Sequence, residues 1–495
     1  MEECLTKARI VNAKVFMSEQ QSDLFGCSAD GFHQQRNCSA CTVSSTNAWN
    51  MNFQTGNMNN NNNKTNSNVV RPLASDDVVY DIPFTSIIEA YEDCVKNKRR
   101  SPDCVYYSMD FESGIYFTWL DIIHGRYKPG RSKCFIVTKP VLREVFAANF
   151  ADRVVHHWIA MRINPLFEAR FEAQGNVSFN CRKGYGILSA VRYAESLIRD
   201  CSENYTKDCW IGKGDIKSYF MSMNKSLIWE MLSDFLYERY QGDDRDCLLY
   251  LLSVTIFNHP EKNCVRRTPK RMWDDLPASK SLFSSEPDKG LPIGNLPSQL
   301  IANFYGSVFD YYVMEVLGIK HYARFVDDFV FVLRDKDDVK KAFRESAKFL
   351  REQLLVELHP KKIYIQHYTK GMYFVGTYLK PGRTYISNRT VGHFYDCLYR
   401  YNELADAGLQ EEYVEKFVQS VNSYLGLMIH YNSYNIRKKI CLRMILPKWG
   451  KFLYIAGHFQ KACVKSEYKS SRKLWKSIKT KKANAILTPE ICAAD

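Results

Sequence analysis

From about residue 82 onward the chain alternates between two hydrophobic patterns, one with the period of a helix and one with the period of a strand. Apolar residues recur at helical spacing in 87–96, 149–171, 227–240, 246–255, 299–316 and 337–355. Runs of β-branched and aromatic residues predict extended structure at 114–116, 133–138, 211–217, in two strands around 325–328, at 362–366 and at 373–379. After Gly392 the pattern is almost wholly helical. Strands interleaved with helices, followed by a helical segment, predict an α+β core with an appended helical domain.

Residues 1–75 differ in composition from the rest of the chain. Asparagine dominates 57–68, and this low-complexity run predicts a polar linker. Immediately before it, Trp49, Met51 and Phe53 alternate with polar residues at strand spacing, and residues 55–56 supply a turn signal. A small hairpin that returns after this turn is therefore the alternative, although two strands alone are marginally stable in water.

The charge balance narrows the class of partner. Among 495 residues, 68 Lys and Arg stand against 54 Asp and Glu, which gives a formal net charge of +14 and a pI near 8.9. Each cation placed near a phosphate displaces condensed counterions, so a basic surplus favours a nucleic-acid partner. Many basic proteins bind no nucleic acid, and the composition alone leaves both classes open.

Targeting and redox signals predict a cytoplasmic protein without a membrane partner. No run approaches the ~18 apolar residues that a bilayer-spanning helix needs, and residues 1–20 lack the apolar core of a secretory signal. The 16 cysteines follow no regular framework, which predicts reduced thiols. Cys27, Cys38 and Cys41, with His33 between them, form the tightest group. A zinc site is one interpretation of this group, and unpaired thiols are the other.

Three aspartates interrupt strongly apolar stretches. Asp215 lies near the end of the strand predicted at 211–217, and Asp327 and Asp328 lie between two apolar runs. Neighbouring side chains of a strand point to opposite faces, so an adjacent acidic pair favours the tip of a hairpin. A buried carboxylate without a partner is costly, and a pair of divalent ions about 4 Å apart is a natural counter-charge that supports in-line phosphoryl transfer. For an isolated acidic pair, a solvated surface turn is the alternative.

The segments around these aspartates resemble the motifs of reverse transcriptases. Residues 325–328 are similar to the aromatic-x-Asp-Asp motif, with Phe where Tyr is usual, and 215–220 is similar to the first aspartate motif. Five further segments resemble the family's finger motifs, its nucleotide-binding motif and the motifs that follow; they are 143–153, 181–186, 290–299, 358–362 and 370–376. The segments occur in the family's order, and the resemblance extends from about residue 76 to about residue 480.

Within the family, the chain is most similar to the reverse transcriptases of diversity-generating retroelements. The ending Gly-Asn-x-x-Ser-Gln at 294–299 is typical of that branch, in which most members carry Thr at the position of Pro297. The resemblance implies copying of a template-repeat RNA into cDNA, with errors at adenines, for mutagenic retrohoming. Residues 49–72 also resemble the variable segment of the lectin-like proteins that these elements diversify. The extension is therefore either partly translated template-repeat sequence or an inert linker.

The resemblance implies a right-hand polymerase fold of the α+β class. We expect fingers at 76–200, a palm with a small antiparallel sheet and the catalytic aspartates at 201–385, and a helical basic thumb and tail at 386–495, after the asparagine-rich extension 1–75. The family also implies partners: a template RNA, a DNA primer and its cDNA, deoxynucleoside triphosphates, and an accessory variability protein.

By resemblance, Asp215, Asp327 and Asp328 are catalytic metal ligands, joined by the backbone carbonyl of Ile216. The implied cofactor is a pair of Mg²⁺ ions, with Mn²⁺ as the alternative, because both prefer hard oxygen ligands. Lys362 is expected to protonate the leaving pyrophosphate, and a solvated lysine at a strand end is the alternative.

Seven other residues are implied in nucleotide binding. They are Arg143, Arg182, Lys183, Phe220, Ile293, Gly294 and Gln299. Arg143 would clamp the triphosphate with its planar fork. Phe220 occupies the place of a bulky gate that excludes a 2′-hydroxyl, unless it is simply a core residue. Ile293 stands where high-fidelity relatives carry Gln, and an apolar side chain removes a hydrogen-bond check near the base pair. Surface salt bridges are the alternative for Arg182 and Lys183.

The C-terminal segment mixes basic and aromatic residues, as a surface that grips a nucleic-acid backbone requires. Its candidate contacts are Arg437, Lys438, Lys439, Lys473 and Lys476. A solvated charged face is the alternative. Two rival functions also stay open: a retron or defence-type reverse transcriptase, and a nucleic-acid-binding protein that has lost catalysis. The intact trio of aspartates argues against the second.

Overall fold

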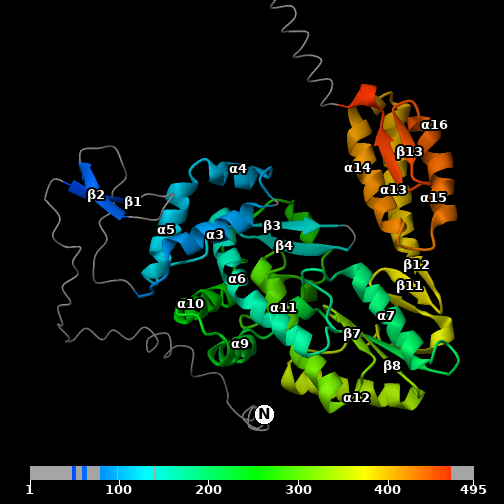
Figure 1. The fold of residues 1–495 in the computed structure, drawn as a ribbon, viewed down its shortest axis with the longest axis horizontal. Helices are drawn as coiled ribbons and strands as arrows, with labels where there is room; N and C mark the ends of the chain where they lie inside the picture. The colour runs from blue at the N-terminus through cyan, green and yellow to red at the C-terminus, as the bar shows by residue number, and fades with distance from the viewer. Residues whose placement is uncertain (1–46, 52–57, 64–78, 97, 139–140, 470–495) are drawn as a thin grey trace, which may run out of the picture. The chain divides into compact units, whose positions relative to one another are not determined.

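The computed structural model describes residues 47–51, 58–63, 79–96, 98–138 and 141–469. The chain forms two compact units, each assembled from segments that are distant in sequence. Unit 1 comprises 1–175, 216–309 and 346–358, and unit 2 comprises 176–215, 310–345 and 359–495. Helices and small sheets occur in both units (Figure 1), which confirms the predicted α+β class.

A helical layer built around α6 forms much of unit 1. Its helices are α3 (Phe84–Val95), α4 (Pro102–Ser108), α5 (Phe111–Ile123), α6 (Phe150–Ala173), α9 (Lys225–Arg239) and α10 (Arg245–Ile256). The side chain of Asn149 caps α6 by accepting a hydrogen bond from the backbone N–H of Asp152 at 2.8 Å. Trp158 and Phe167 of α6 are fully buried, and Phe167 stacks on Phe304 with ring centroids 4.8 Å apart. α6 is thus the central helix of this layer.

Unit 1 also contains a three-stranded sheet in the order β4-β3-β6. β3 (Ser132–Val137) pairs antiparallel with β4 (Arg143–Ala147) and parallel with β6 (Cys264–Arg266). The carboxylate of Glu144 on β4 is fully buried and anchors the loop that follows β6. Its donors in that loop are the indole N–H of Trp273, the hydroxyl of Ser281 and the backbone N–H of Leu282. These bonds offset the cost of burying a carboxylate and fix the loop against the sheet.

Unit 2 is built on a four-stranded antiparallel sheet in the order β7-β8-β5-β9, of which Figure 1 labels β7 and β8. Its strands are β5 (Trp210–Asp215), β7 (Tyr322–Phe325), β8 (Asp328–Leu333) and β9 (Tyr364–His367). One face buries Ile211, Val330 and Val332 against apolar residues of α7 (Ile187–Cys201). The other face packs on the first half of α12 (Lys336–Gln353), where the rings of Phe331 and Phe343 lie 5.3 Å apart. The sheet is therefore covered on both faces.

The two glycines of β5 allow this second face to close. A methyl group at Gly214 would overlap the ring of Phe329, whose Cε2 would lie 2.8 Å away, and one at Gly212 would meet Phe343 at 2.8 Å. Because alternate side chains of a strand point to opposite faces, the residues of β5 that alternate with these glycines share the other face of the sheet. These residues are Ile211, Lys213 and Asp215.

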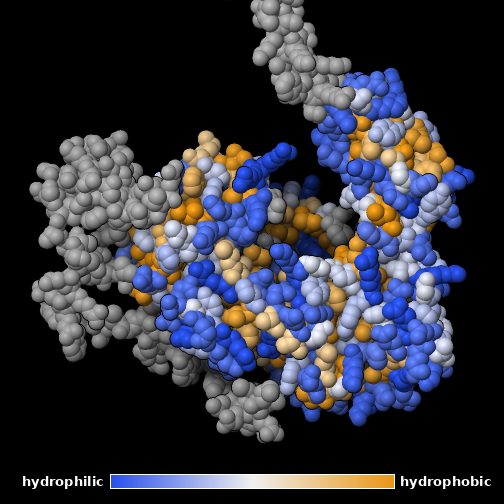
Figure 2. All heavy atoms as spheres, viewed as in Figure 1, coloured by the Kyte–Doolittle hydropathy of each residue, from blue (hydrophilic) through white to orange (hydrophobic). Residues whose placement is uncertain are grey.

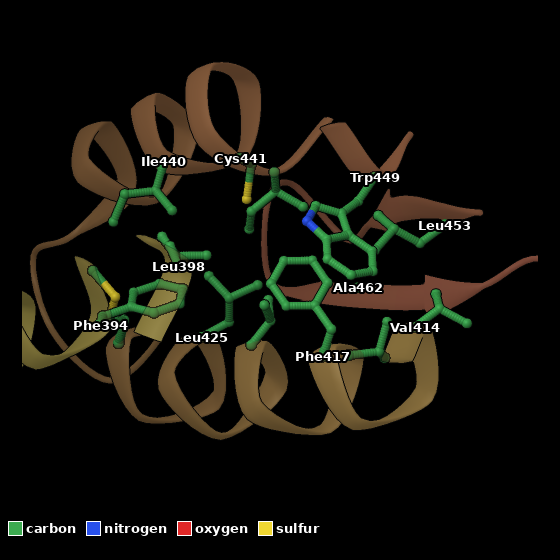
Figure 3. Close-up of a cluster of buried hydrophobic side chains, with 14 of the residues drawn as sticks. Phe394, Leu398, Val414, Phe417, Leu425, Ile440, Cys441, Trp449, Leu453 and Ala462 are labelled. Carbon is green, nitrogen blue, oxygen red and sulfur yellow. The ribbon is translucent and has the colours of Figure 1, made fainter. Parts of the chain in front are cut away.

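The C-terminal part of unit 2 has a core of its own, which follows a small sheet of β10 (Met372–Phe374), β11 (Thr377–Lys380) and β12 (Arg383–Ile386). Its elements are α13 (Asn388–Asp406), α14 (Gln410–Met428), α15 (Tyr434–Ile440), α16 (Leu446–Trp449), β13 (Leu453–Ala456) and β14 (Lys461–Val464). Phe394, Phe417 and Trp449 are buried in this core (Figure 3), and the rings of Phe417 and Trp449 stack at 4.1 Å. The helical periodicity of the sequence places these apolar residues on one side of each helix.

Near the N-terminus the predicted hairpin is present. β1 (Asn47–Met51) pairs antiparallel with β2 (Met58–Asn63). The predicted strand at 114–116 is wrong, because these residues lie inside α5. A Cβ at Gly114 would meet the ring of Tyr107 at 2.9 Å, so this glycine permits a close approach within the helical layer rather than marking an extended segment.

Two predictions in the second half of the chain are also wrong. Residues 373–379 do not form one strand, because they contain the β10–β11 hairpin. The strand predicted at 362–366 corresponds to β9, which pairs with β5 and not with this hairpin. The turn at 375–376 has positive φ at both residues, and its valine gave no turn signal in the sequence. The C-terminal part is not wholly helical, since β13 and β14 form an antiparallel hairpin. Its turn contains Gly457, His458 and Phe459, all at positive φ, and of these only the glycine is a usual turn residue.

No helix within the described ranges is long and apolar enough to span a bilayer. The cysteines in those ranges are free thiols. The group of Cys27, Cys38, Cys41 and His33 lies outside the described residues.

We expect Gly214→Ala to destabilise the protein, because the new methyl group would force the ring of Phe329 away from β5. The loss should be about 1–3 kcal/mol, the usual range for overpacking a core. Gly392→Ala is the matched control: nothing lies within 4 Å of a Cβ at Gly392 in α13. A helix interior favours alanine over glycine by about 1 kcal/mol, so this variant should be neutral or slightly stabilised. Thermal unfolding of both variants checks the prediction, and equal melting temperatures would contradict it.

Candidate active site

The three aspartates meet at one end of the unit 2 sheet. Asp215 is the last residue of β5 and Asp328 the first of β8, and the antiparallel register pairs them directly. Side chains opposite each other in such a pair have Cβ atoms about 5 Å apart. Asp327 precedes Asp328 in the turn that joins β7 to β8, so the acidic pair lies at a hairpin tip, as the sequence predicted. Asp215 is only 6% exposed, and the other two are half-buried.

The three carboxylates repel one another. Burial of its carboxyl group, together with the carboxylates of Asp215 and Asp328, raises the pKa of Asp327 to about 7. Burial also raises the pKa of Asp328, and the ammonium group of Lys213 opposes that rise. Negative charge gathered in a half-buried place is costly without a cation. The end of this sheet is therefore a site that demands positive charge.

Two lysines supply part of that charge. The ammonium group of Lys362 lies 2.8 and 2.7 Å from the two carboxylate oxygens of Asp215, and that of Lys213 lies 3.1 Å from Oδ1 of Asp328. The side chain of Lys362 is 53% exposed, whereas that of Lys213 is 12% exposed. Lys362 can therefore leave its partner at little cost, and Lys213 is a built-in part of the site.

The donor set fits a magnesium or manganese site by its chemistry, since carboxylate oxygens are the ligands these ions prefer. Among the described residues, no group of three or more His, Cys, Asp or Glu side chains is arranged around a common point that could hold a metal ion. The ion pairs explain this, because lysines hold two of the three carboxylates. A divalent cation would compete with Lys362 for Asp215. Ile216, whose carbonyl was expected to be a further ligand, follows Asp215 and is buried in unit 1.

Unit 1 brings several of the expected nucleotide-binding residues together. Phe220 lies on α8 (Tyr219–Ser222), and both Phe220 and Ile293 pack on a cluster that contains Phe146 of β4. The backbone N–H of Leu291 donates to the carbonyl of Phe220 at 2.8 Å, and that of Phe146 donates to the carbonyl of Ile293 at 2.8 Å. The segment that carries Ile293 is thus fixed between the short helix and the β3–β4 sheet.

Gly294 is required by this arrangement. Its φ is 116°, and a Cβ there would lie 2.7 Å from Cγ1 of Val145 and 2.9 Å from the carbonyl oxygen of Phe146. Arg143 begins the same strand, β4, with an exposed side chain. Gln299 is half-buried in α11 (Leu296–Tyr311). The glycine motif therefore lets the Ile293 segment lie directly against the strand of Arg143.

Arg182 and Lys183 differ in their surroundings. Arg182 is buried, and its guanidinium donates to the carbonyl of Ser178 at 2.9 Å and to Oδ1 of Asn176 at 2.6 Å. It also lies 4.0 Å from the ring centroid of Tyr185. These contacts hold the loop before α7 together, so Arg182 has a structural role in unit 2. Lys183 is exposed.

The basic residues of the C-terminal segment also differ from one another. The guanidinium of Arg437 is buried and donates to the carbonyls of His458 and Phe459 at 3.2 and 2.8 Å, which fixes the β13–β14 turn. Lys438 and Lys439 are exposed. Lys473 and Lys476 lie outside the described residues. Hydrophilic residues cover much of the α13–α16 segment on the face drawn in Figure 2.

Two residues of this site were missed in the sequence. Lys213 stands two positions before Asp215 on one strand, and the period of two places both on the same face, so the signal was present. Arg324 lies three positions before Asp327 in an otherwise apolar strand and is fully buried. A buried arginine needs a partner, but the sequence does not say which acid it is.

Comparison with known proteins yields distant relatives. No protein-family model matches the chain. Protein YkfC of Escherichia coli (strain K12) is 22% identical over 293 residues, which cover 52% of this chain and 68% of that protein. Among solved structures, apo telomerase from Candida tropicalis, truncated from its C-terminal domain, overlaps with a TM-score of 0.38 and 13% identity over 50% of this chain and 53% of that chain.

A second overlap is with telomerase from Candida albicans in complex with a fragment of telomeric RNA, with a TM-score of 0.39 and 11% identity over 66% of this chain and 63% of that chain. The chain thus spans between about half and two thirds of the length of these telomerase chains. These overlaps are too partial to define the fold, which rests on the strand order and register given above.

We expect Asp327→Asn to raise the stability of the protein at pH 8 in a chelating buffer. The folded-state pKa of Asp327, about 7, exceeds the ordinary value, so its ionisation opposes folding above that pH. The gain should be roughly 1–3 kcal/mol, fade as the pH falls below 7, and shrink when Mg²⁺ offsets the repulsion. Thermal unfolding with and without Mg²⁺ measures it. Asp337→Asn removes an exposed aspartate that pairs with Lys340 and should give no gain. A gain for neither variant would contradict the argument.

Proposed function

We propose that this chain is an RNA-directed DNA polymerase, that is, a reverse transcriptase. The observation that carries the proposal is the direct pairing of Asp215 with Asp328 across β5 and β8, with Asp327 in the adjoining turn. Paired carboxylates at the end of a small antiparallel sheet are what two-metal phosphoryl transfer needs. The order of the seven sequence motifs supports the same assignment. The proposed palm contains this sheet, the proposed fingers lie within 76–200, and the proposed thumb is the helical segment after residue 386.

In the proposed reaction, Asp215, Asp327 and Asp328 hold two magnesium ions, which when bound neutralise the charge that develops during in-line phosphoryl transfer. By fixing where the cations would bind, the carboxylates would set the positions of the primer hydroxyl and the triphosphate, because this chemistry depends mainly on positioning and electrostatics. Lys362 would release Asp215 as the site fills, and its exposed ammonium group is the proposed proton donor to the leaving pyrophosphate. Lys213 stays on Asp328 and holds that carboxylate in place.

We assign nucleotide selection to the cluster in unit 1. The ring of Phe220 would exclude a 2′-hydroxyl from the incoming sugar, which favours deoxynucleotides. Ile293, packed in the same cluster, would present an apolar surface to the new base pair. Gly294 keeps that segment against β4, and the exposed Arg143 on β4 is the proposed triphosphate clamp. Lys183 and Gln299 are secondary contacts in this proposal.

The proposed nucleic-acid contacts are the exposed Lys438 and Lys439, with Lys473 and Lys476 further along the chain. Their role would be to neutralise template and primer phosphates, which makes binding dependent on salt. Arg437 is excluded from this set because its guanidinium is committed to backbone carbonyls. Template RNA, DNA primer and deoxynucleoside triphosphates are the proposed substrates.

The finer assignment is to a diversity-generating retroelement. In it the enzyme copies a template-repeat RNA with errors at adenines and works with an accessory variability protein. The Gly-Asn-x-x-Ser-Gln ending at 294–299 and the apolar Ile293 support it. A retron or defence-type enzyme is the rival, and accurate copying would favour that rival.

Primer extension on an RNA template with Mg²⁺ and deoxynucleotides tests the function. We expect synthesis by the full chain, and a loss of at least about 10³-fold in an Asp327→Ala/Asp328→Ala variant, because charge neutralisation at the site supplies several kcal/mol of transition-state stabilisation. Sequencing of the products should show errors concentrated at template adenines. Equal synthesis by both proteins would mean that the aspartates are not catalytic, and binding without synthesis would favour the non-catalytic function.

We expect Ile293→Gln to raise accuracy opposite template adenines. The new amide could hydrogen-bond near the base pair, and one such bond is worth about 1.4 kcal/mol, or roughly tenfold in discrimination. Ile293→Leu keeps the volume and the apolar surface, so its error spectrum should match that of the wild type. Deep sequencing of cDNA from the three proteins makes the comparison. An identical spectrum for Ile293→Gln would count against a fidelity role for this position.

A further inference from the structure

The turn that carries Asp327 contains a residue in an unfavourable backbone conformation. Val326 has φ of 61°, in the left-handed region, where β-branched side chains are rarely found. Glycine or asparagine would adopt this conformation far more easily. The conformation of Val326 sets the direction in which the following two carboxylates leave the turn. Something outside the turn must therefore hold it.

A buried arginine contacts this turn directly. Arg324, on β7, is 0% exposed, and its Nη1 donates to the carbonyl oxygen of Val326 at 3.0 Å. Its Nε and Nη2 donate to the two carboxylate oxygens of Asp310, each at 2.7 Å. Tyr322 adds a hydrogen bond from its hydroxyl to Asp310 Oδ1 at 2.8 Å. The guanidinium fork thus joins a buried carboxylate to the backbone of the catalytic turn.

The base of this arrangement is rigid. The backbone N–H of Arg324 donates to the carbonyl of Val177 at 2.8 Å, and its carbonyl accepts from Phe179 at 3.2 Å. β7 is the outermost strand of the β7-β8-β5-β9 sheet. Residues 177–179 supply hydrogen-bond partners to the backbone of Arg324 on the outer edge of this strand. With its backbone fixed on that side and its side chain fixed by Asp310, Arg324 has little freedom to follow a moving turn.

We propose that Arg324, oriented by Asp310, is a positioning residue that holds Val326 in the left-handed conformation and thereby aims Asp327 and Asp328. This inference rests on the proposed polymerase function. A pair that served only stability would not need a donor on the turn, and buried ion pairs are often no more stabilising than apolar residues of similar size. Lysine cannot replace the arginine, because an ammonium group lacks the planar fork that serves two partners at fixed angles.

The first test compares Arg324→Lys and Asp310→Asn with the wild type in primer extension on an RNA template. We expect kcat to fall by roughly tenfold or more and KM for the deoxynucleotide to change by less than about threefold, because the reacting groups are misplaced while the substrate contacts remain. Arg162→Lys is the matched control. Arg162 also forms a shielded ion pair, 2.5 Å from Asp244, but that pair lies in unit 1 and touches no proposed site residue.

The decisive variant is Val326→Gly placed in the Arg324→Lys background. Glycine adopts the left-handed conformation without help, so it should restore kcat by at least about threefold. Arg324→Lys should also lower the melting temperature, because it breaks the buried pair with Asp310, and Val326→Gly should not reverse that loss. Hydrogen exchange of the segment 325–329 gives a readout without catalysis: it should be faster in Arg324→Lys than in Arg162→Lys. Retained kcat in Arg324→Lys, or unchanged exchange at 325–329, would overturn the proposal, as would a kcat loss that Val326→Gly fails to relieve. An inactive wild type with the expected exchange difference would instead overturn the proposed function alone.

Discussion

The structure of unit 2 depends on holding three carboxylates together at the end of one sheet. Asp215 and Asp328 face each other across β5 and β8, and Asp327 adds a third charge from the turn. Mutual repulsion and partial burial both work against this arrangement, as the raised pKa of Asp327 records. Backbone hydrogen bonds of the sheet fix the strands so firmly that the carboxylates cannot move apart. The surrounding residues then serve to neutralise or to aim them.

Neutralisation and aiming fall to different kinds of residue. Lys362 is exposed and holds Asp215 with a long, flexible side chain, which suits a counter-ion that departs when another cation arrives. The side chain of Lys213 is largely buried and forms an ion pair with Asp328. On β5 it lies on the same face as Asp215. Arg324 binds none of the three carboxylates and donates to the backbone of the turn instead. A single cation type could not perform these tasks, because they need different exposure and geometry.

The sequence predicted the local features well, because periodicity and paired acids are local signals. It located the strand that ends at Asp215 and the hairpin that carries Asp327. It failed where tertiary contacts decide. Gly114 lies in a helix and in close contact with Tyr107, a contact that the sequence does not show. The turns at 375–376 and 457–459 place Val375, His458 and Phe459 at positive φ, where such residues are unusual. The partner of Arg324 could not be named, since Asp310 lies near the end of α11 and meets Arg324 only in the folded chain.

The difference between local signals and tertiary contacts also explains why the roles of basic residues were harder to assign than those of acidic ones. A carboxylate in an apolar strand is costly without a cation partner, so the pattern singled out Asp215 and Asp327, and the resemblance supplied their expected role. An arginine can have several roles, because its long stem and five donors suit backbone carbonyls as well as phosphates. Arg182 and Arg437 illustrate this: both are buried and bind main-chain oxygens, Arg182 within its own loop and Arg437 in the β13–β14 turn. For a basic protein that binds nucleic acid, charge in the sequence therefore overstates the contact surface, and exposure in the folded chain must decide which cations remain available to phosphate.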